Sequence, residues 1–191
     1  MVIGIFCESC TGKSTIAEEK SDKEVIRILS KKLIIITGSP GVGKTAVAEN
    51  LFESYENSAY FDGDWAWRVN PFSITDPRLR NGDKTMSFAL STYLNSDFEY
   101  VIFSSVVVIG ESIRDAIIKD INAKDYEIIS FTLKCSEQTL IKRLKNRGDT
   151  NEVSFKWLRM KPHCDDFVID TEDKTVNQIA DEIRSIIDLR I

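Results

Sequence analysis

Short apolar runs rich in β-branched residues alternate along this chain with segments of helical periodicity. The apolar runs are residues 33–37, 58–61, 100–103, 128–133 and 167–169. The segments with a helical pattern are residues 46–55, 84–94, 111–121, 137–147 and 176–189. Runs that are apolar at nearly every position are typical of parallel strands covered by helices on both faces. The alternation therefore predicts an α/β three-layer sandwich, with a parallel sheet of about five strands and helices on both sides.

The beginning of the chain repeats part of this pattern. Residues 2–6 are apolar, and residues 11–15 read Thr-Gly-Lys-Ser-Thr, which looks like a second phosphate-binding loop. Cys7 stands where the first glycine of such a loop belongs, and a Cβ there prevents a close turn around a phosphate. Some 30 residues are also too few for a complete βαβ unit. We therefore expect residues 1–30 to be an appended β/α segment with a degenerate loop, and residues 31–191 to be the main domain.

Composition narrows the classes of partner. The chain has 191 residues and is 42% hydrophobic, which is enough for one full core. Lys and Arg number 25 against 30 Asp and Glu, giving a net charge of −5, and basic residues form no long run. Polymeric nucleic acid is therefore not an expected partner. The apolar runs are far shorter than the roughly 20 residues that span a bilayer, so we expect no membrane insertion.

The cysteines indicate the cellular compartment that we expect for this protein. The four cysteines come without a recognisable secretory leader, which predicts a cytoplasmic protein with reduced thiols. Cys7 and Cys10 have the spacing of half a zinc or redox site. A zinc site needs two more ligands, and His163 is the only histidine in the sequence. We expect these two cysteines to be small loop residues.

The clearest chemical signal lies between the run at 33–37 and the helical segment that follows it. Residues 38–45 match the Walker A pattern at every position: Gly38, Ser39, Pro40, Gly41, Val42, Gly43, Lys44 and Thr45. Glycines let the backbone wrap a phosphate, and the N–H groups of the loop and helix N-terminus attract an anion. In this pattern Lys44 reaches the β- and γ-phosphates and Thr45 ligates Mg²⁺. The sequence thus predicts binding of ATP and Mg²⁺.

Two other classes of P-loop protein fit less well. Guanine-specific GTPases normally carry the motif Asn-Lys-x-Asp, whereas residues 122–125 read Asn-Ala-Lys-Asp. The Asp-x-x-Gly motif of GTPases is also absent from the sequence. A GTPase switch is therefore not expected. The run at 100–103 leads into Ser104 and Ser105, without the acid that typical Walker B strands carry at their tip. This argues against a motor or transporter ATPase.

An acidic pair follows the run at 58–61. Asp62 and Asp64 stand where the carboxyl end of a parallel strand would meet the ligand crevice. Together with the Walker A loop, this Asp-Gly-Asp sequence resembles the acceptor site of the small, AAA-type P-loop kinases. These include shikimate kinase, adenylylsulfate kinase, gluconate kinase and chloramphenicol phosphotransferase. The resemblance implies a fold like that of nucleoside monophosphate kinases. The resemblance implies that Asp62 helps to hold Mg²⁺ and that Asp64 acts as base on the acceptor hydroxyl. The alternative is a turn in which Asp62 caps a helix.

The segment Leu140 to Asp149 resembles the helix that enters the lid of these kinases, most closely the Arg-Gly-Asp stretch of chloramphenicol phosphotransferase. Arg143 and Arg147 are spaced by four and would share one helix face. A guanidinium can bridge the β- and γ-phosphates, where negative charge spreads in the transition state. The alternative for each arginine is a solvated basic face. A further basic residue expected later in the lid is missing, so either the lid is short or Lys156 or Arg159 supplies its charge.

The acceptor is expected to bind after Asp64, in a segment rich in aromatic and arginine residues. Arg68 or Arg80 indicates an anionic group on the acceptor, and Trp65 and Trp67 indicate a flat or apolar moiety. Either tryptophan could instead pack this segment against the core. The leading prediction is a kinase for a small molecule or nucleotide, acting as a monomer or homodimer. A nucleoside monophosphate kinase and an ATP-binding regulator without transferase activity are the alternatives.

Overall fold

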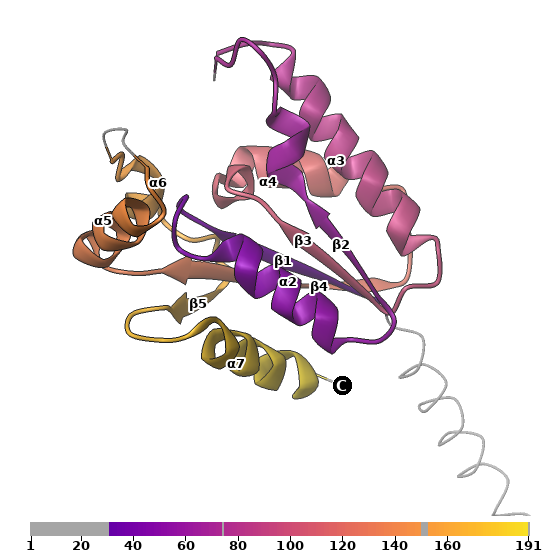
Figure 1. The fold of residues 1–191 in the computed structure, drawn as a ribbon. Coiled ribbons are helices and arrows are strands. Elements are labelled where there is room, and N and C mark those ends of the chain that lie inside the picture. Colours follow the sequence, from indigo (N-terminus) through magenta and orange to yellow (C-terminus); the bar gives the residue numbers. More distant parts are fainter. Residues whose placement is uncertain (1–30, 74, 150–152, 191) are drawn as a thin grey trace, which may run out of the picture. The chain divides into compact units, whose positions relative to one another are not determined.

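The structure, a computed structural model, describes residues 31–73, 75–149 and 153–190. Its centre is a five-stranded sheet in the order β2-β3-β1-β4-β5, and every neighbouring pair is parallel. Figure 1 shows this sheet with β1 at its middle. The strands are β1 (Lys31–Gly38), β2 (Ser58–Asp62), β3 (Tyr100–Ser104), β4 (Tyr126–Lys134) and β5 (Phe167–Asp170).

Helices follow the strands along the chain, as parallel pairing requires. The α-helices are α2 (Lys44–Ser54), α3 (Leu79–Leu94), α4 (Glu111–Lys119), α5 (Glu137–Asn146), α6 (Lys156–Arg159) and α7 (Val176–Asp188). Two short 3-10 helices, η1 (Gly63–Trp67) and η2 (Val107–Ile109), follow β2 and β3. A capping box starts α7: Thr175 accepts from the Gln178 N–H, and the Gln178 side chain accepts from the Thr175 N–H.

The sheet is covered on both faces, which explains its continuous apolar strands. Along β1, Ile34 and Ile36 point into a core shared with α2, α5 and α7, while Leu33 and Ile35 point into a second core shared with α3 and α4. All four side chains are at most 1% exposed. Burying each contributes about 1.5–3 kcal/mol to stability.

The predicted three-layer α/β fold is confirmed, with all five strands where the sequence places them. The expected appended segment at residues 1–30 lies outside the described residues, so the domain division stays a prediction. Among the described helices, none is both long enough and apolar enough to cross a bilayer.

Candidate active site

The loop between β1 and α2 has the backbone that a phosphate cradle needs. Gly38, Gly41 and Gly43 have φ values of 145°, 90° and 105°, which L side chains rarely adopt. A Cβ on Gly38 would also lie 2.6 Å from the Leu133 carbonyl oxygen. Close packing of β4 against this loop therefore requires glycine at position 38.

The N-terminus of α2 differs from those of α5 and α7. Ser136 and Thr175 cap α5 and α7 with their side chains, whereas the N-cap residue of α2 is Gly43, which has no side chain to donate or accept. Its first turn also carries no acid. The first N–H groups of α2 and the positive end of its dipole are thus available to an anion.

Lys44 and Thr45 open α2. Lys44 is only 6% exposed, and its Nζ donates to the Ser39 carbonyl oxygen at 3.3 Å, inside the loop. Burial lowers the pKa of Lys44, while the carboxylates of Asp64 and Asp62 oppose this effect. The Thr45 side chain lies beside Asp62. The loop thus brings an ammonium group and a hydroxyl to the two predicted acids.

Asp62 ends β2 and has two neighbours that matter. Its carboxylate caps η1 by accepting a hydrogen bond from the Asp64 N–H at 3.0 Å. The alternative that Asp62 caps a helix is therefore confirmed for this contact. Burial raises the pKa of Asp62, while hydrogen bonds from the Asp64 N–H and the Thr45 side chain act in the opposite direction. Asp62 is therefore both a helix cap and a neighbour of the predicted metal-binding hydroxyl.

Asp64 is held from the other side, by the loop that follows β3. Its Oδ1 accepts from the Ser105 hydroxyl at 2.8 Å and from the Val106 N–H at 2.9 Å. The side chain lines a cleft of about 560 Å³ together with the phosphate loop. The structure thus brings Asp64 to the cleft predicted for the phosphates.

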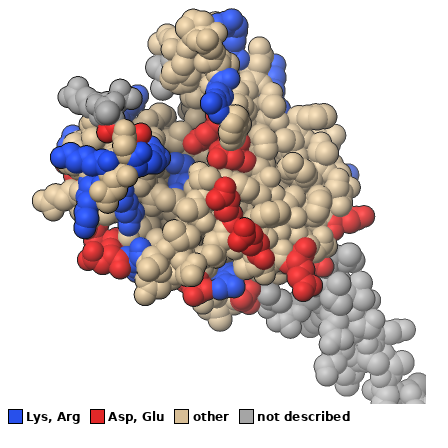
Figure 2. Space-filling view, in the orientation of Figure 1, with Lys and Arg blue, Asp and Glu red and all other residues tan. Residues whose placement is uncertain are grey.

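Arg143 and Arg147 line the same cleft, but their surroundings differ. Arg143 donates to the Val42 carbonyl oxygen at 3.2 Å and to the Thr171 hydroxyl and carbonyl oxygens at 2.9 and 2.7 Å. It therefore ties α5 to the phosphate loop. Arg147 has 61% of its side chain exposed and pairs with Asp149. Figure 2 shows Lys and Arg side chains gathered over the α5 and α6 region, across from a group of acidic side chains.

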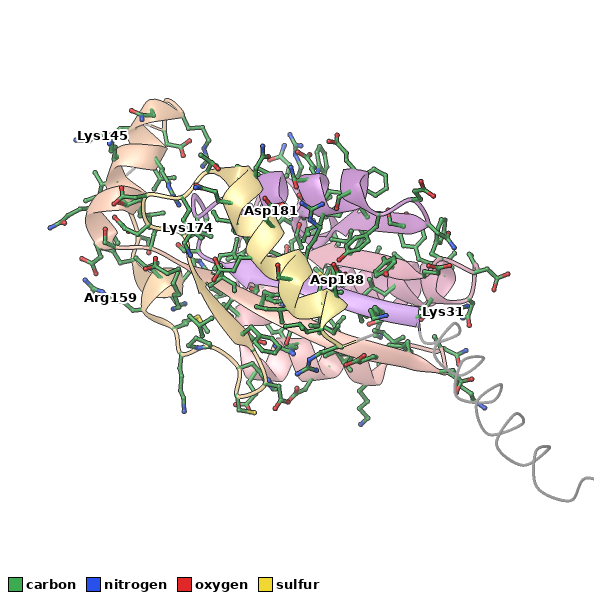
Figure 3. All side chains as sticks on the ribbon, turned by 90° about the horizontal axis from the view of Figure 1, so that it is seen from below. Lys31, Lys145, Arg159, Lys174, Asp181 and Asp188 are labelled. Atoms are coloured by element: carbon green, nitrogen blue, oxygen red, sulfur yellow. The ribbon has the colours of Figure 1, made fainter. Side chains whose placement is uncertain are left out.

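Lys156 and Arg159, the other basic candidates for the lid, lie on α6. The Lys156 ammonium lies over the Trp157 ring, and Arg159 pairs with Glu137 of α5 at 2.7 Å. Neither lines the cleft. Figure 3 shows Arg159 apart from Lys174, which lies on the loop that leads into α7.

The segment predicted to bind the acceptor divides into an exposed pair and a buried group. Trp65 is 64% exposed, and the Arg68 guanidinium lies 4.4 Å from its ring centroid. Trp67 is 7% exposed, and its indole N–H donates to Asp83 at 2.8 Å. Arg80 stacks over Trp67 at 4.8 Å and pairs with Asp83 at 3.0 Å. Trp67 and Arg80 therefore hold η1 against α3, whereas Trp65 and Arg68 face solvent.

Residues at the start of α7 complete the cleft, and the sequence reasoning missed them. Lys174, Thr175, Val176 and Ile179 line it opposite the phosphate loop. They follow β5, and loops at the carboxyl ends of parallel strands border the ligand crevice of an open α/β sheet. Applying that rule to the last strand as well as to β2 would have found them.

Comparisons with known proteins agree with this architecture. Residues 34–156, more than half of the chain, match the family model described as AAA domain. No curated protein matches the chain. Solved structures match over most of their length.

Three of these structures are enzymes or resistance proteins from bacteria. The APS kinase of Mycobacterium tuberculosis, solved with AMPPNP and APS, is 16% identical, with 83% of this chain and 98% of that chain covered and a TM-score of 0.62. The tunicamycin resistance protein of Deinococcus radiodurans is 20% identical, with 82% and 95% covered and a TM-score of 0.60. A gluconokinase of Sinorhizobium meliloti is 17% identical, with 81% and 89% covered and a TM-score of 0.59. The chain therefore has the fold of the small P-loop kinases, as the resemblance in sequence predicted.

Proposed function

This chain belongs to the AAA domain family and, because it also has the fold of the small P-loop kinases, we propose that it is an ATP-dependent phosphotransferase whose acceptor is a small molecule or a nucleotide. One observation carries the proposal. A single cleft is lined by the phosphate loop, by a carboxylate and by two arginines. These are the groups that phosphoryl transfer needs: a phosphate cradle, a base and positive charge at the transferred group.

The donor side is assigned to the phosphate loop, residues 38–45. The backbone N–H groups and Lys44 would hold the β- and γ-phosphates of ATP, with Lys44 leaving the Ser39 carbonyl oxygen to do so. Arg147, exposed at the cleft, would stabilise the charge that spreads over the transferred group. Arg143, fixed between Val42 and Thr171, would add positive charge and hold the loop in shape.

Mg²⁺ fits the residues beside the phosphate loop. Thr45 supplies a hydroxyl and Asp62 a carboxylate next to it, and magnesium prefers oxygen ligands of these kinds in combination with substrate phosphates. When bound, the metal would neutralise part of the charge on the phosphates. Thr45 and Asp62 are therefore the residues proposed to hold it.

The acceptor side is assigned to Asp64, Trp65 and Arg68. Asp64 would accept the proton of the acceptor hydroxyl. The hydroxyl oxygen then bonds to the γ-phosphorus of ATP, while the bond between that phosphorus and the leaving ADP breaks. Trp65 and Arg68 lie directly after Asp64 and offer an exposed ring and cation. Arg80, also predicted to contact the acceptor, is paired with Asp83. We therefore propose that Arg80 contributes much less than Arg68 to acceptor binding.

An ADP-release assay across hydroxyl, carboxylate and nucleotide acceptors tests the proposal, with ATP binding measured in parallel by calorimetry. We expect Mg²⁺-dependent ADP release stimulated by one class of hydroxyl compound. Stimulation by nucleoside monophosphates would identify a nucleotide kinase. Tight ATP binding without turnover for any acceptor would overturn the transferase assignment and leave an ATP-binding regulator.

A further inference from the structure

The tip of β3 carries two buried serines where many P-loop proteins have an acid. Ser104 ends the strand and Ser105 follows it, and both are 0% exposed. The Ser104 hydroxyl lies 2.8 Å from the Tyr60 hydroxyl. Ser105 instead contacts Asp64, the predicted base. The two neighbouring serines therefore have different hydrogen-bond partners, and only Ser105 contacts the predicted base.

The backbone of Ser105 is clamped to the strand that leads into the phosphate loop. Its N–H donates to the Ile36 carbonyl oxygen at 3.2 Å, and its carbonyl oxygen accepts from the Thr37 hydroxyl at 2.8 Å. Ile36 and Thr37 directly precede Gly38, the first residue of the loop. The position of Ser105 is thus fixed relative to the phosphate cradle.

The Ser105 side chain has a defined hydrogen-bond direction. Its oxygen accepts from the Val107 N–H at 3.3 Å, and its O–H donates to Asp64 Oδ1 at 2.8 Å. The Val106 N–H donates to the same Oδ1. Both hydrogen bonds that the described residues donate to the Asp64 carboxylate thus go to Oδ1. Oδ2 is left for an acceptor hydroxyl.

We infer that Ser105 is a positioning residue, which aims Oδ2 of Asp64 at the acceptor and couples the base to the strand that carries the phosphate loop. The inference rests on the proposed function, in which Asp64 acts on the acceptor hydroxyl. Ser105 contacts the base and has no assigned contact with ATP. Its loss should therefore lower the rate of transfer and leave ATP binding unchanged.

The first experiment compares Ser105→Ala with Ser87→Ala in the full chain. Ser87 is also buried, and among the described residues its hydroxyl donates only to the Asp83 and Ile117 carbonyl oxygens of α3 and α4. ADP release from ATP, with water as acceptor, is measured beside the affinity for AMPPNP. Because a misplaced group costs up to about 100-fold in rate, we expect Ser105→Ala to lower kcat about 10- to 100-fold. Ser87→Ala should keep the wild-type kcat, and both variants should keep the wild-type affinity.

A second pair isolates the hydroxyl. Thr and Val have nearly the same shape, so Ser105→Thr should recover most of the rate and Ser105→Val should remain as slow as Ser105→Ala. Equal rates for Ser105→Ala and the wild type, or for the Thr and Val variants, would overturn the inference.

A crystal structure of Ser105→Ala separates this inference from the proposed function. We expect the Asp64 carboxylate to rotate away from its wild-type orientation, since only the Val106 N–H still holds it. An unchanged carboxylate would refute the positioning role even if the wild type proved inactive. An inactive wild type with a rotated carboxylate would refute the transferase assignment alone.

Discussion

The proposed donor and acceptor sides of the cleft differ in how their groups are held. On the donor side, one continuous segment, residues 38–45, supplies the cradle, and much of its chemistry comes from backbone N–H groups fixed by glycines. On the acceptor side, Asp64 accepts a hydrogen bond from the side chain of Ser105, in the loop that follows β3, and Trp65 and Arg68 face solvent. A cradle formed by one continuous segment can be recognised from the sequence alone, whereas the hydrogen-bond partners that other elements supply become visible only in the fold.

Removing Lys44 tests the donor side with the largest expected effect. Lys44→Ala takes away the one ammonium group buried in the phosphate loop, so we expect ATP binding and transfer to fall below detection. Lys13→Ala is the matched control, because the loop at residues 7–14 is predicted to be degenerate, and both properties should stay nearly unchanged. Calorimetry with ATP and the ADP-release assay measure the two effects. Binding that survives Lys44→Ala would contradict the assignment of the working loop.

Removing the base should separate the two sides. Asp64→Asn keeps the shape of the side chain and its contact with Ser105, but it cannot take a proton, so kcat should fall about 1,000-fold. ATP affinity should stay close to that of the wild type, because Asp64 is assigned no contact with the donor.

Asp62→Asn is the matched variant on the neighbouring acid. It should instead raise the Mg²⁺ concentration needed for half-maximal activity. A titration of both variants with MgCl₂ distinguishes them, and a near wild-type kcat for Asp64→Asn would show that another group is the base.

The two arginines that line the cleft offer a sharper test of the proposed donor side. Arg147→Ala should lower kcat about 100-fold and raise the KM for ATP much less, since an exposed arginine engages most strongly as charge develops.

Arg143→Ala removes the hydrogen bonds to Val42 and Thr171, so it should weaken ATP binding and lower the melting temperature as well. Steady-state kinetics and thermal denaturation measure both variants. An effect of Arg147→Ala on KM alone would give that arginine a role in ground-state binding.

The same contrast explains what the sequence could predict. The three central strands β1, β3 and β4 are mostly buried, so their apolar runs are nearly continuous and their positions follow from the hydrophobic pattern. The start of α3 was missed, because the expected helix begins at residue 84 and the observed one at Leu79. Gly82 looks like a helix breaker, yet a Cβ there would lie 2.6 Å from the Ala66 carbonyl oxygen. Close contact between η1 and α3 therefore requires this glycine, and only the tertiary structure reveals that contact.

The candidate site shows the same division. The Walker A loop and the acid pair lie close together in sequence, and the structure places them as expected beside one another. Ser105 meets Asp64, and the residues at the start of α7 meet the cleft, only through the strand order. The sequence also could not tell Arg68 from Arg80, because the difference between them lies in the neighbours that folding gives each side chain.

The smallest expected effects concern those two arginines. Arg68 stacks on an exposed ring next to Asp64, so Arg68→Gln should raise the KM for an anionic acceptor about tenfold, the effect of losing one charge-assisted hydrogen bond. Arg80 pairs with Asp83 with half of its side chain exposed, which is worth at most about 1 kcal/mol. Arg80→Gln should therefore leave that KM unchanged and lower the melting temperature by about 2–4 °C at most. Acceptor kinetics and thermal denaturation of both variants measure these effects. If Arg80→Gln raised the KM and Arg68→Gln did not, the acceptor would bind toward α3, and the exposed Trp65 ring would lose its assigned role.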